Sequence, residues 1–338
     1  MTIKKTELGN ATWLIEKLPV VKPIKRKCEA DYYGASALIA KSLGLDKVPE
    51  SLASWNHGIA FWREPVLPRQ VVLTATQLDR CLVFNKQQEI FLRRKGFLRA
   101  HAVGAPILYV PKMRVSRIKK SLLVMPSHTL FNTNPNMPFD EYAQSISSYY
   151  SEFETIVACI HINDVRKGYW PAAFEKVNIP WVAGADSHDG NALVRVACLF
   201  SLFEFMTANA LGSHIPYATY FGCKPSVAGP IAEHKTSDFH GVPWYDRNRK
   251  ALHYGRISKE KYLKGPRNPD FFVEPTQAKI HLRFAEQALG VDCRKSPEEV
   301  ANLLGWNKAG QAELRIRRTL RQSLNRSVSI IRRLRKKR

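Results

Sequence analysis

The sequence lacks an apolar run long enough to cross a bilayer as a helix. The longest apolar stretch, Ala192–Met206, is interrupted by Arg195 and Glu204 and is shorter than the ~18 residues that a spanning helix needs. Residues 1–18 also lack the uninterrupted apolar core and the small-residue cleavage site of a secretory signal. We therefore expect a cytoplasmic protein without a transmembrane helix.

Patterns for metal binding and disulfide chemistry are also absent. The six cysteines lie far apart and form no C-x-x-C pair. The ten histidines are equally dispersed and include no H-E-x-x-H motif. The sequence therefore predicts no metal and no cofactor, and most of its cysteines look like small core residues.

Acidic residues are scarce, since 29 Asp and Glu accompany 52 Lys and Arg and leave a net charge of +23. The basic tail, Arg315–Arg338, has eleven Lys and Arg and no acid. Apolar residues recur in it at spacings of three and four, which predicts an amphipathic helix with arginine-rich outer faces; they are Ile316, Leu320, Leu324, Val328, Ile331 and Leu334.

Such a helix suits an anionic membrane surface, so we expect the protein to be peripheral at the inner membrane. The expected lipid-facing cations are Arg315, Arg318, Arg321, Arg332 and Arg333. A helix packed on its own domain with solvated arginines is the main alternative. Nucleic acid is disfavoured, because the tail has no recognition motif with interleaved aromatics.

The stretch Phe203–Pro230 predicts, in order, a strand, a polar turn, a helix and a strand. Ser213 suits the N-cap of the helix and Gly222 its C-cap. A helix that starts directly after a strand directs free N–H groups at the ligand crevice of an open α/β sheet, and His214 would add a donor or a charge there. The alternative is that Asn209 and Ser213 only cap the helix.

The preceding chain repeats this alternation. Strands are expected over Ser121–Met125, Thr155–Ile162 and Asn178–Ala183, with helices over Asp140–Tyr150 and Asn191–Leu202. We therefore predict a doubly wound parallel sheet, whose ligands bind beyond the carboxyl ends of the strands. Polar clusters follow these strands, and they include Ser127, His128, Thr129, Asp186, His188, Thr207 and Asn209. Asp186 and His188 are equally suited to an ordinary helix start.

Residues before 116 predict a smaller α/β unit. It ends in a strand at Arg80–Asn85, a helix at Lys86–Lys95 and a strand at Val103–Val110. Within it, Gly58 leaves His57 at the tip of a Trp-Asn-His-Gly turn, where an imidazole can exchange a proton or be merely structural. The expected division is a first domain over residues 1–115, a second over 119–290 and a helical tail over 291–338.

Three segments resemble a known family. The C-terminal two-thirds, from SLLVMPSHT to FEFMTANALGSHIPYATYFGCKPSV, is similar to the nucleotide-sugar domain of bacterial GT-B glycosyltransferases that build lipopolysaccharide, O-antigen and capsule. The WNHG turn resembles the W-x-H-G loop in their amino-terminal domains and in polymerases that transfer glycerol phosphate. The segments RCLVFNKQQEIFLRRKGF and VGAPILYV resemble the β-α-β unit that closes that domain, although this first domain is shorter than usual.

The resemblance implies two Rossmann-like domains that hold a nucleotide-sugar donor and a saccharide or lipid-linked saccharide acceptor. It implies metal-independent transfer, which agrees with the absence of a D-x-D motif. Thr207, Asn209, Ser213 and His214 would meet the donor phosphate, and Ser127, His128 and Thr129 would face it across the cleft. His57 would act as the base, with Glu64 and Asp79 as other candidates.

Two other classes of function remain open from the sequence. A relative with different chemistry, such as a polyol-phosphate transferase or a nucleotide-sugar epimerase, would share the sheet and the phosphate site. A non-enzymatic basic protein that binds membranes or nucleic acid would show steeply salt-dependent binding and no affinity for nucleotides.

Overall fold

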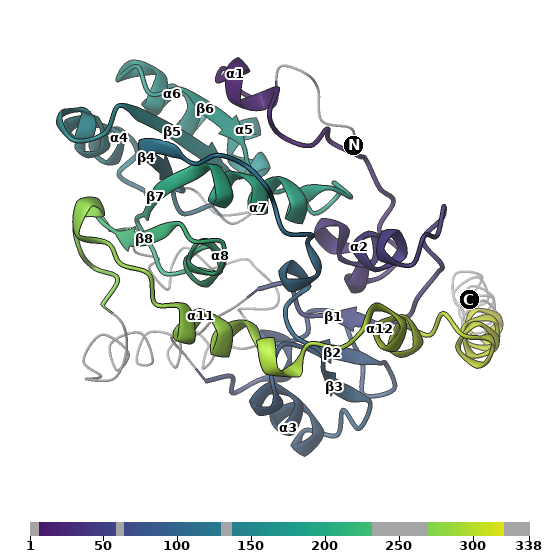
Figure 1. Ribbon diagram of the computed structural model, residues 1–338. Helices are drawn as coiled ribbons and strands as arrows, with labels where there is room; N and C mark the ends of the chain where they lie inside the picture. The colour runs from purple at the N-terminus through teal and green to yellow at the C-terminus, as the bar shows by residue number, and fades with distance from the viewer. Residues whose placement is uncertain (1–6, 59–63, 130–136, 232–269, 321–338) are drawn as a thin grey trace, which may run out of the picture.

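The computed structural model describes residues 7–58, 64–129, 137–231 and 270–320 (Figure 1). Its larger sheet has five parallel strands in the order β6-β5-β4-β7-β8. They are β4 (Ile118–Val124), β5 (Thr155–Ile160), β6 (Trp181–Ala183), β7 (Phe203–Ala208) and β8 (Lys224–Val227). The order reverses between β4 and β7, which makes this pair the topological switch point of the sheet.

Helices cover both faces of this sheet. Leu122 and Val124 of β4 pack with α4 (Phe139–Ser147) and α6 (Tyr169–Lys176), which α5 (Ile162–Lys167) precedes. Leu123, between them, packs on the other face with α7 (Ala192–Leu202) and α8 (His214–Tyr220). Because alternate residues of a strand face opposite sides, the apolar run of β4 is buried on both. The predicted doubly wound parallel sheet is confirmed.

The predicted elements of this sheet occur with small shifts at their ends. Shifts of three residues occur at β4, which begins at Ile118 and not at Ser121, and at β6, which begins at Trp181 and not at Asn178. Asn178 has a φ of +57°, and Pro180 has no N–H to give to a neighbouring strand. Gly222, with a φ of +78°, lies two residues after α8, as a C-cap glycine should.

The smaller sheet has three parallel strands, β1 (Ser54–Trp55), β2 (Cys81–Val83) and β3 (Ala100–Ala102), in that order. The predicted strand near Arg80 and the helix α3 (Lys86–Arg94) are confirmed. The strand predicted over Val103–Val110 is wrong, since β3 ends at Ala102 and a 3-10 helix, η4 (Pro106–Tyr109), follows. Gly104 has a φ of +79° and Pro106 has no N–H, so neither extends a strand.

The two sheets share one apolar core. Trp55 and Phe84 from the smaller sheet belong to the same buried cluster as Leu123 and Met206 from the larger one. The helix α2 (Ala35–Ser42) contributes Leu38 and Ile39 to this cluster. The fold is therefore mixed α/β with two parallel sheets, which agrees with a Rossmann-like architecture.

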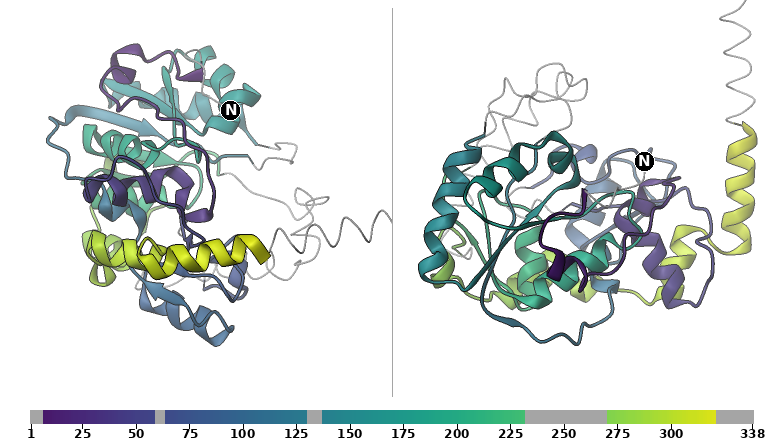
Figure 2. Two further views of the ribbon diagram at one scale, coloured as in Figure 1. Left: turned by 90° about the vertical axis from the view of Figure 1, so that its right-hand side faces the viewer. Right: turned by 90° about the horizontal axis from the view of Figure 1, so that it is seen from above.

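Both ends of the described chain return to these sheets. Residues 8–24 follow the edge of the larger sheet, where Ala11 N donates to Trp181 O at 3.1 Å, and they include α1 (Thr12–Ile15). The helix α11 (Leu282–Leu289) packs on α8, and α12 (Pro297–Leu304) packs on α2. Residues 308–320 form a helix at the edge of the molecule (Figure 2). The predicted division into domains stays a prediction.

Among the described residues, no helix is both long and apolar enough to cross a bilayer.

Candidate functional site

The loops after β4 and β7 meet at the switch point of the larger sheet. Ser127 N, after β4, donates to Asn209 Oδ1, after β7, at 2.7 Å. Met125 N also donates to Thr207 O at 2.8 Å and extends the pairing of the two strands. The sequence-predicted residues Ser127, Thr207 and Asn209 are thus brought together at the position where open α/β sheets bind ligands.

Two buried polar atoms at this point have no hydrogen-bond partner within the described chain. They are Thr207 Oγ1 and Asn209 Nδ2, and both residues have 0% exposure. Buried polar groups are almost always paired in folded proteins, so an orphan amide beside an orphan hydroxyl requires a physical reason. A bound polar group at the switch point would supply the missing partners.

The loop after β4 is also held by hydrogen bonds to α5. Thr129 N and Oγ1 both donate to the Asp164 carboxylate, and Lys167 Nζ donates to Thr129 Oγ1 at 2.7 Å. Burial raises the pKa of Asp164, and the bonds from Thr129 oppose this shift. Thr129 is 2% exposed, so the structure gives it a role in fixing the loop and not a free hydroxyl.

Two histidines, His128 and His161, lie together at the same edge. The rings of His128 and His161 have centroids 4.9 Å apart, and His161 Nδ1 accepts from Asn163 N at the start of α5. Burial, together with the neighbouring His128, lowers the pKa of His161 to about 4. His161 is therefore neutral at neutral pH and presents a second nitrogen that can donate.

His214 lies inside the first turn of α8 and folds back on the preceding loop. Its Nε2 donates to Ala210 O at 3.1 Å, and its ring fills the space where a Cβ on Gly212 would lie. Burial lowers the pKa of His214 to about 4. The imidazole thus offers no positive charge at neutral pH, and its predicted contact with a phosphate stays a prediction. Ser213 is the N-cap residue as predicted, but its side chain does not cap the helix.

The loop after β6 connects the larger sheet with the segment before α2. Asp186 is buried and its Oδ1 accepts from His188 N at 2.9 Å and approaches His188 Nδ1 at 3.3 Å. Ser187 O accepts from Tyr33 N at 3.2 Å, and Ser187 Oγ accepts from Arg26 NH1 at 2.8 Å. Neither Asp186 nor His188 caps α7, because the N-cap residue of that helix is Asn191.

Tyr33 joins this loop to the predicted catalytic histidine. It is a bulky residue at a φ of +59°, and its ring centroid lies 5.5 Å from that of His57, while Tyr32 lies 5.0 Å from His57 on another side. Burial raises the pKa of the Tyr33 hydroxyl, and the Asp186 carboxylate raises it further. A non-glycine residue held in the left-handed region is strained, and such strain is concentrated at functional sites.

His57 is held next to a buried carboxylate. Its Nδ1 lies 3.7 Å from Glu29 Oε1, and Glu29 accepts hydrogen bonds from Ser54 Oγ at 2.7 Å and from Leu73 N at 3.0 Å. Burial lowers the pKa of His57, while the charge of Glu29 opposes the change. The imidazole is therefore neutral at neutral pH and lies beside a fixed anion, while its Nδ1 has no hydrogen-bond partner in the described chain. A neutral imidazole in this position can act as a general base.

The other two predicted bases lie in different surroundings. Asp79 Oδ2 accepts from Thr76 N at 2.7 Å, and its Oδ1 pairs with Arg317 NH1 at 2.7 Å. Glu64 is exposed. Neither contacts His57. The residues that sequence reasoning missed are Arg26, Glu29, Tyr33 and Lys167. The compact run of acidic and aromatic residues in Glu29–Tyr33 was a signal for Glu29 and Tyr33, and Arg26 and Lys167 had none.

In the part of the chain that the structure describes, no group of three His, Cys, Asp or Glu is arranged to hold a metal ion. No family model matches the chain, and no curated protein does so. The function is therefore argued from the residues of the site.

Proposed function

We propose that the chain is a GT-B type glycosyltransferase that moves a sugar from a nucleotide-sugar donor to a saccharide or lipid-linked saccharide acceptor in bacterial surface polysaccharide synthesis. The observation that supports this most is the position of His57. It is a neutral imidazole beside the Glu29 carboxylate, and its ring contacts Tyr33, whose N–H donates to Ser187 O in the loop after β6 at the carboxyl edge of the larger sheet.

The chemistry assigned to His57 is removal of one proton. Its free ring nitrogen accepts the proton of an acceptor hydroxyl while the hydroxyl oxygen bonds to the anomeric carbon of the donor sugar. The bond from that carbon to the donor phosphate oxygen breaks, and the nucleotide leaves with the electron pair. The Glu29 carboxylate stabilises the imidazolium that forms, because it lies 3.7 Å from Nδ1.

The donor side of the proposal uses the switch point. Thr207 Oγ1 and Asn209 Nδ2 are the buried atoms that lack partners, and they would hydrogen-bond to phosphate or ribose oxygens of the donor. Lys167 of α5, which donates to Thr129 Oγ1, would supply a cation for the leaving phosphate. We assign the charge stabilisation to these groups and to His128, and not to a metal.

The test is a thermal-shift screen against UDP, GDP, CMP, CDP, ADP and dTDP. A nucleotide that binds only the folded protein raises its stability by roughly 2.7 kcal/mol at a hundredfold excess over Kd. Thr207→Val removes a hydroxyl without a partner while keeping the side-chain shape, so the unliganded protein should melt at an unchanged or higher temperature. The nucleotide Kd should rise about tenfold, the equivalent of one hydrogen bond.

Thr219→Val is the matched control. Thr219 is also buried with an unpartnered Oγ1, but it lies within α8 and not at the carboxyl end of a strand. This variant should bind nucleotide as the wild type does. Absence of a response to every nucleotide, or an equal loss of affinity in both variants, would reject the donor site.

A further inference from the structure

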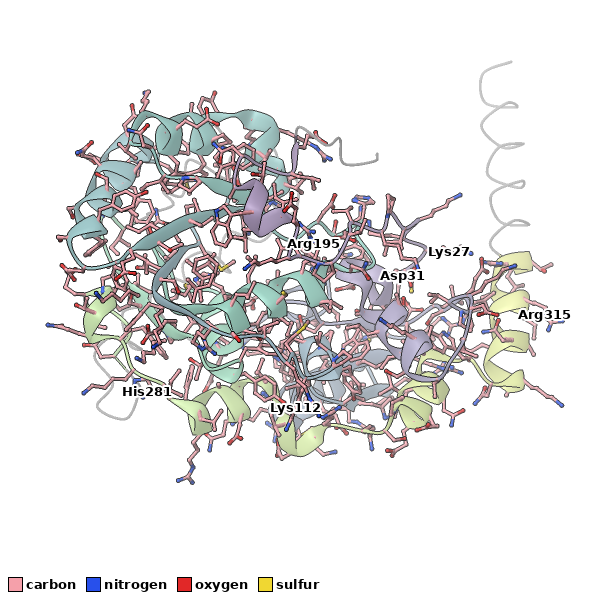
Figure 3. All side chains as sticks on the ribbon, turned by 45° about the horizontal axis from the view of Figure 1, so that its top comes forward. Lys27, Asp31, Lys112, Arg195, His281 and Arg315 are labelled. Atoms are coloured by element: carbon pink, nitrogen blue, oxygen red, sulfur yellow. The ribbon has the colours of Figure 1, made fainter. Side chains whose placement is uncertain are left out.

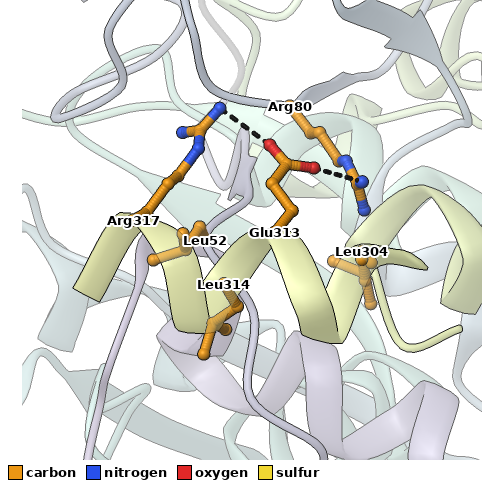
Figure 4. Close-up of a pocket in the computed structure, with 8 residues that line it drawn as sticks. Leu52, Arg80, Leu304, Glu313, Leu314 and Arg317 are labelled. Atoms are coloured by element: carbon orange, nitrogen blue, oxygen red, sulfur yellow. Dashed lines mark hydrogen bonds and ion pairs between the residues drawn. The ribbon is translucent and has the colours of Figure 1, made fainter. Parts of the chain in front are cut away.

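The described part of the C-terminal helix, residues 308–320, is held beside the smaller sheet by ion pairs, and Glu313 makes three of them. Glu313 pairs with Arg80 at 2.7 Å and with Arg317 of the next helical turn at 2.8 Å (Figure 4). It also pairs with Arg99 at 2.6 Å. The Arg99 hydrogen bond is the main cause that lowers the pKa of Glu313 to about 2. The carboxylate thus stays ionised at every pH near neutrality, and the helix has one fixed orientation.

A small cavity beside this cluster does not account for the arrangement. It has a volume of about 10 Å³ and is lined by Leu52, Leu304 and Leu314 together with the ionic groups. That volume holds roughly one water molecule. The cluster therefore serves to position the helix and does not bind a substrate.

The fixed orientation leaves large apolar side chains in solvent. Ile316 and Leu320, one helical turn apart, are 61% and 59% exposed. Leu78 is 72% exposed, and its carbonyl oxygen accepts from Arg317 NH2 at 2.5 Å, so it lies beside the helix. We call Leu78, Ile316 and Leu320 the apolar face. Arg315 and Arg318, both exposed, belong to the same helical segment, and Arg318 also pairs with Glu50.

We propose that the apolar face docks on an anionic lipid bilayer. Exposed apolar side chains next to arginines match an interface in which the former enter the acyl boundary and the latter meet anionic headgroups. The charge of the chain agrees, since Arg315–Arg338 holds eleven Lys and Arg and no acid. Nucleic acid would be bound by the cations alone, and it gives no reason to expose two apolar residues on successive turns.

Docking on a bilayer does not depend on the enzymatic activity. A bilayer contact that is fixed relative to the smaller sheet would hold the candidate site of the protein at a constant height above the membrane. Such a position suits an acceptor that is itself anchored in the bilayer.

The experiment is flotation of the full chain with vesicles of phosphatidylcholine alone or mixed with phosphatidylglycerol. Binding should require the anionic lipid and weaken as salt is raised, because exposed charges are screened. The double variant Ile316→Ser and Leu320→Ser should reduce partitioning to mixed vesicles about tenfold, through the loss of inserted apolar area. Both residues are exposed, so its thermal unfolding should match the wild type.

The matched control is Ile90→Ser with Leu98→Ser. Both residues are exposed and lie on or directly after α3 in the same part of the molecule, and partitioning should change less than twofold. Arg315→Gln provides a second variant that should weaken binding only to the anionic vesicles. Equal binding to neutral vesicles, or an unaffected double variant, overturns the proposal. Salt-dependent binding to duplex DNA or RNA with no vesicle binding assigns the tail to nucleic acid and overturns it as well.

Discussion

At the scale of single residues, the charge of Glu29 has a direct effect on His57. Its charge raises the pKa of His57 against the effect of burial. Glu29→Gln keeps the size but removes the charge, so the pKa of His57 should fall further. The acid limb of kcat/KM against pH should move to lower pH, and kcat should fall about tenfold because the imidazolium loses its stabilising anion.

Three measurements distinguish this effect from general damage. His57→Ala should abolish turnover while nucleotide binding persists, since His57 does not belong to the donor side. Asp79→Asn should leave the pH profile unchanged, because Asp79 pairs with Arg317 and not with His57. A Glu29→Gln enzyme that loses activity with no displacement of the acid limb would mean that Glu29 is structural.

At the scale of elements, a buried ion pair fixes residues 17–24 to the start of α7. Asp189 Oδ2 lies 3.7 Å from Arg195 Nε, and Arg195 NH1 donates to Pro19 O at 2.6 Å. The side chain of Arg195 is labelled in Figure 3. Both side chains are nearly inaccessible, and burial raises the pKa of Asp189. Arg195 also keeps one buried nitrogen, NH2, without a hydrogen-bond partner in the described chain.

Removal of one charge from this pair should be costly. Asp189→Asn retains an oxygen for Lys22 N and Asn191 N but leaves the Arg195 guanidinium buried without an anion. The free energy of unfolding, measured in urea, should fall by about 3 kcal/mol. Asp140→Asn is the control, because the Asp140–Lys176 pair joins α4 and α6 in solvent and should contribute less than about 1 kcal/mol. Equal losses in the two variants would contradict the buried pair's role.

The structure also explains which elements could be predicted from the sequence. Alternation of strands and helices was sufficient for β4 to β8, because each parallel strand is a short apolar run with polar residues at its end. It failed at Val103–Val110, where every residue is buried in the 3-10 segment as it would be in a strand. Glu29 escaped prediction because its partners Ser54, Leu73 and Thr74 lie 25 to 45 residues away and only the fold brings them together.

At the scale of the whole molecule, the two sheets are joined by a shared core and by one close backbone contact. A Cβ on Gly34, which has a φ of +80°, would lie 2.1 Å from Gly190 O in the loop after β6. Gly34 directly follows Tyr33, and the same loop contains Asp186 and Ser187. This approach therefore sets the distance between the His57 side of the site and the edge of the larger sheet.

Gly34→Ala should force these two backbones apart. It should lower the free energy of unfolding by about 3 kcal/mol, from overpacking and from the positive φ together, and it should lower kcat by more than the loss of folded protein explains. Gly44→Ala is a matched control, because Gly44 also has a positive φ, +67°, but a Cβ there meets nothing within 4 Å. That control should lose about 1 kcal/mol and no activity per folded molecule. Urea unfolding and turnover of both variants decide the matter, and equal effects would show that the Gly34–Gly190 contact does not set the geometry of the site.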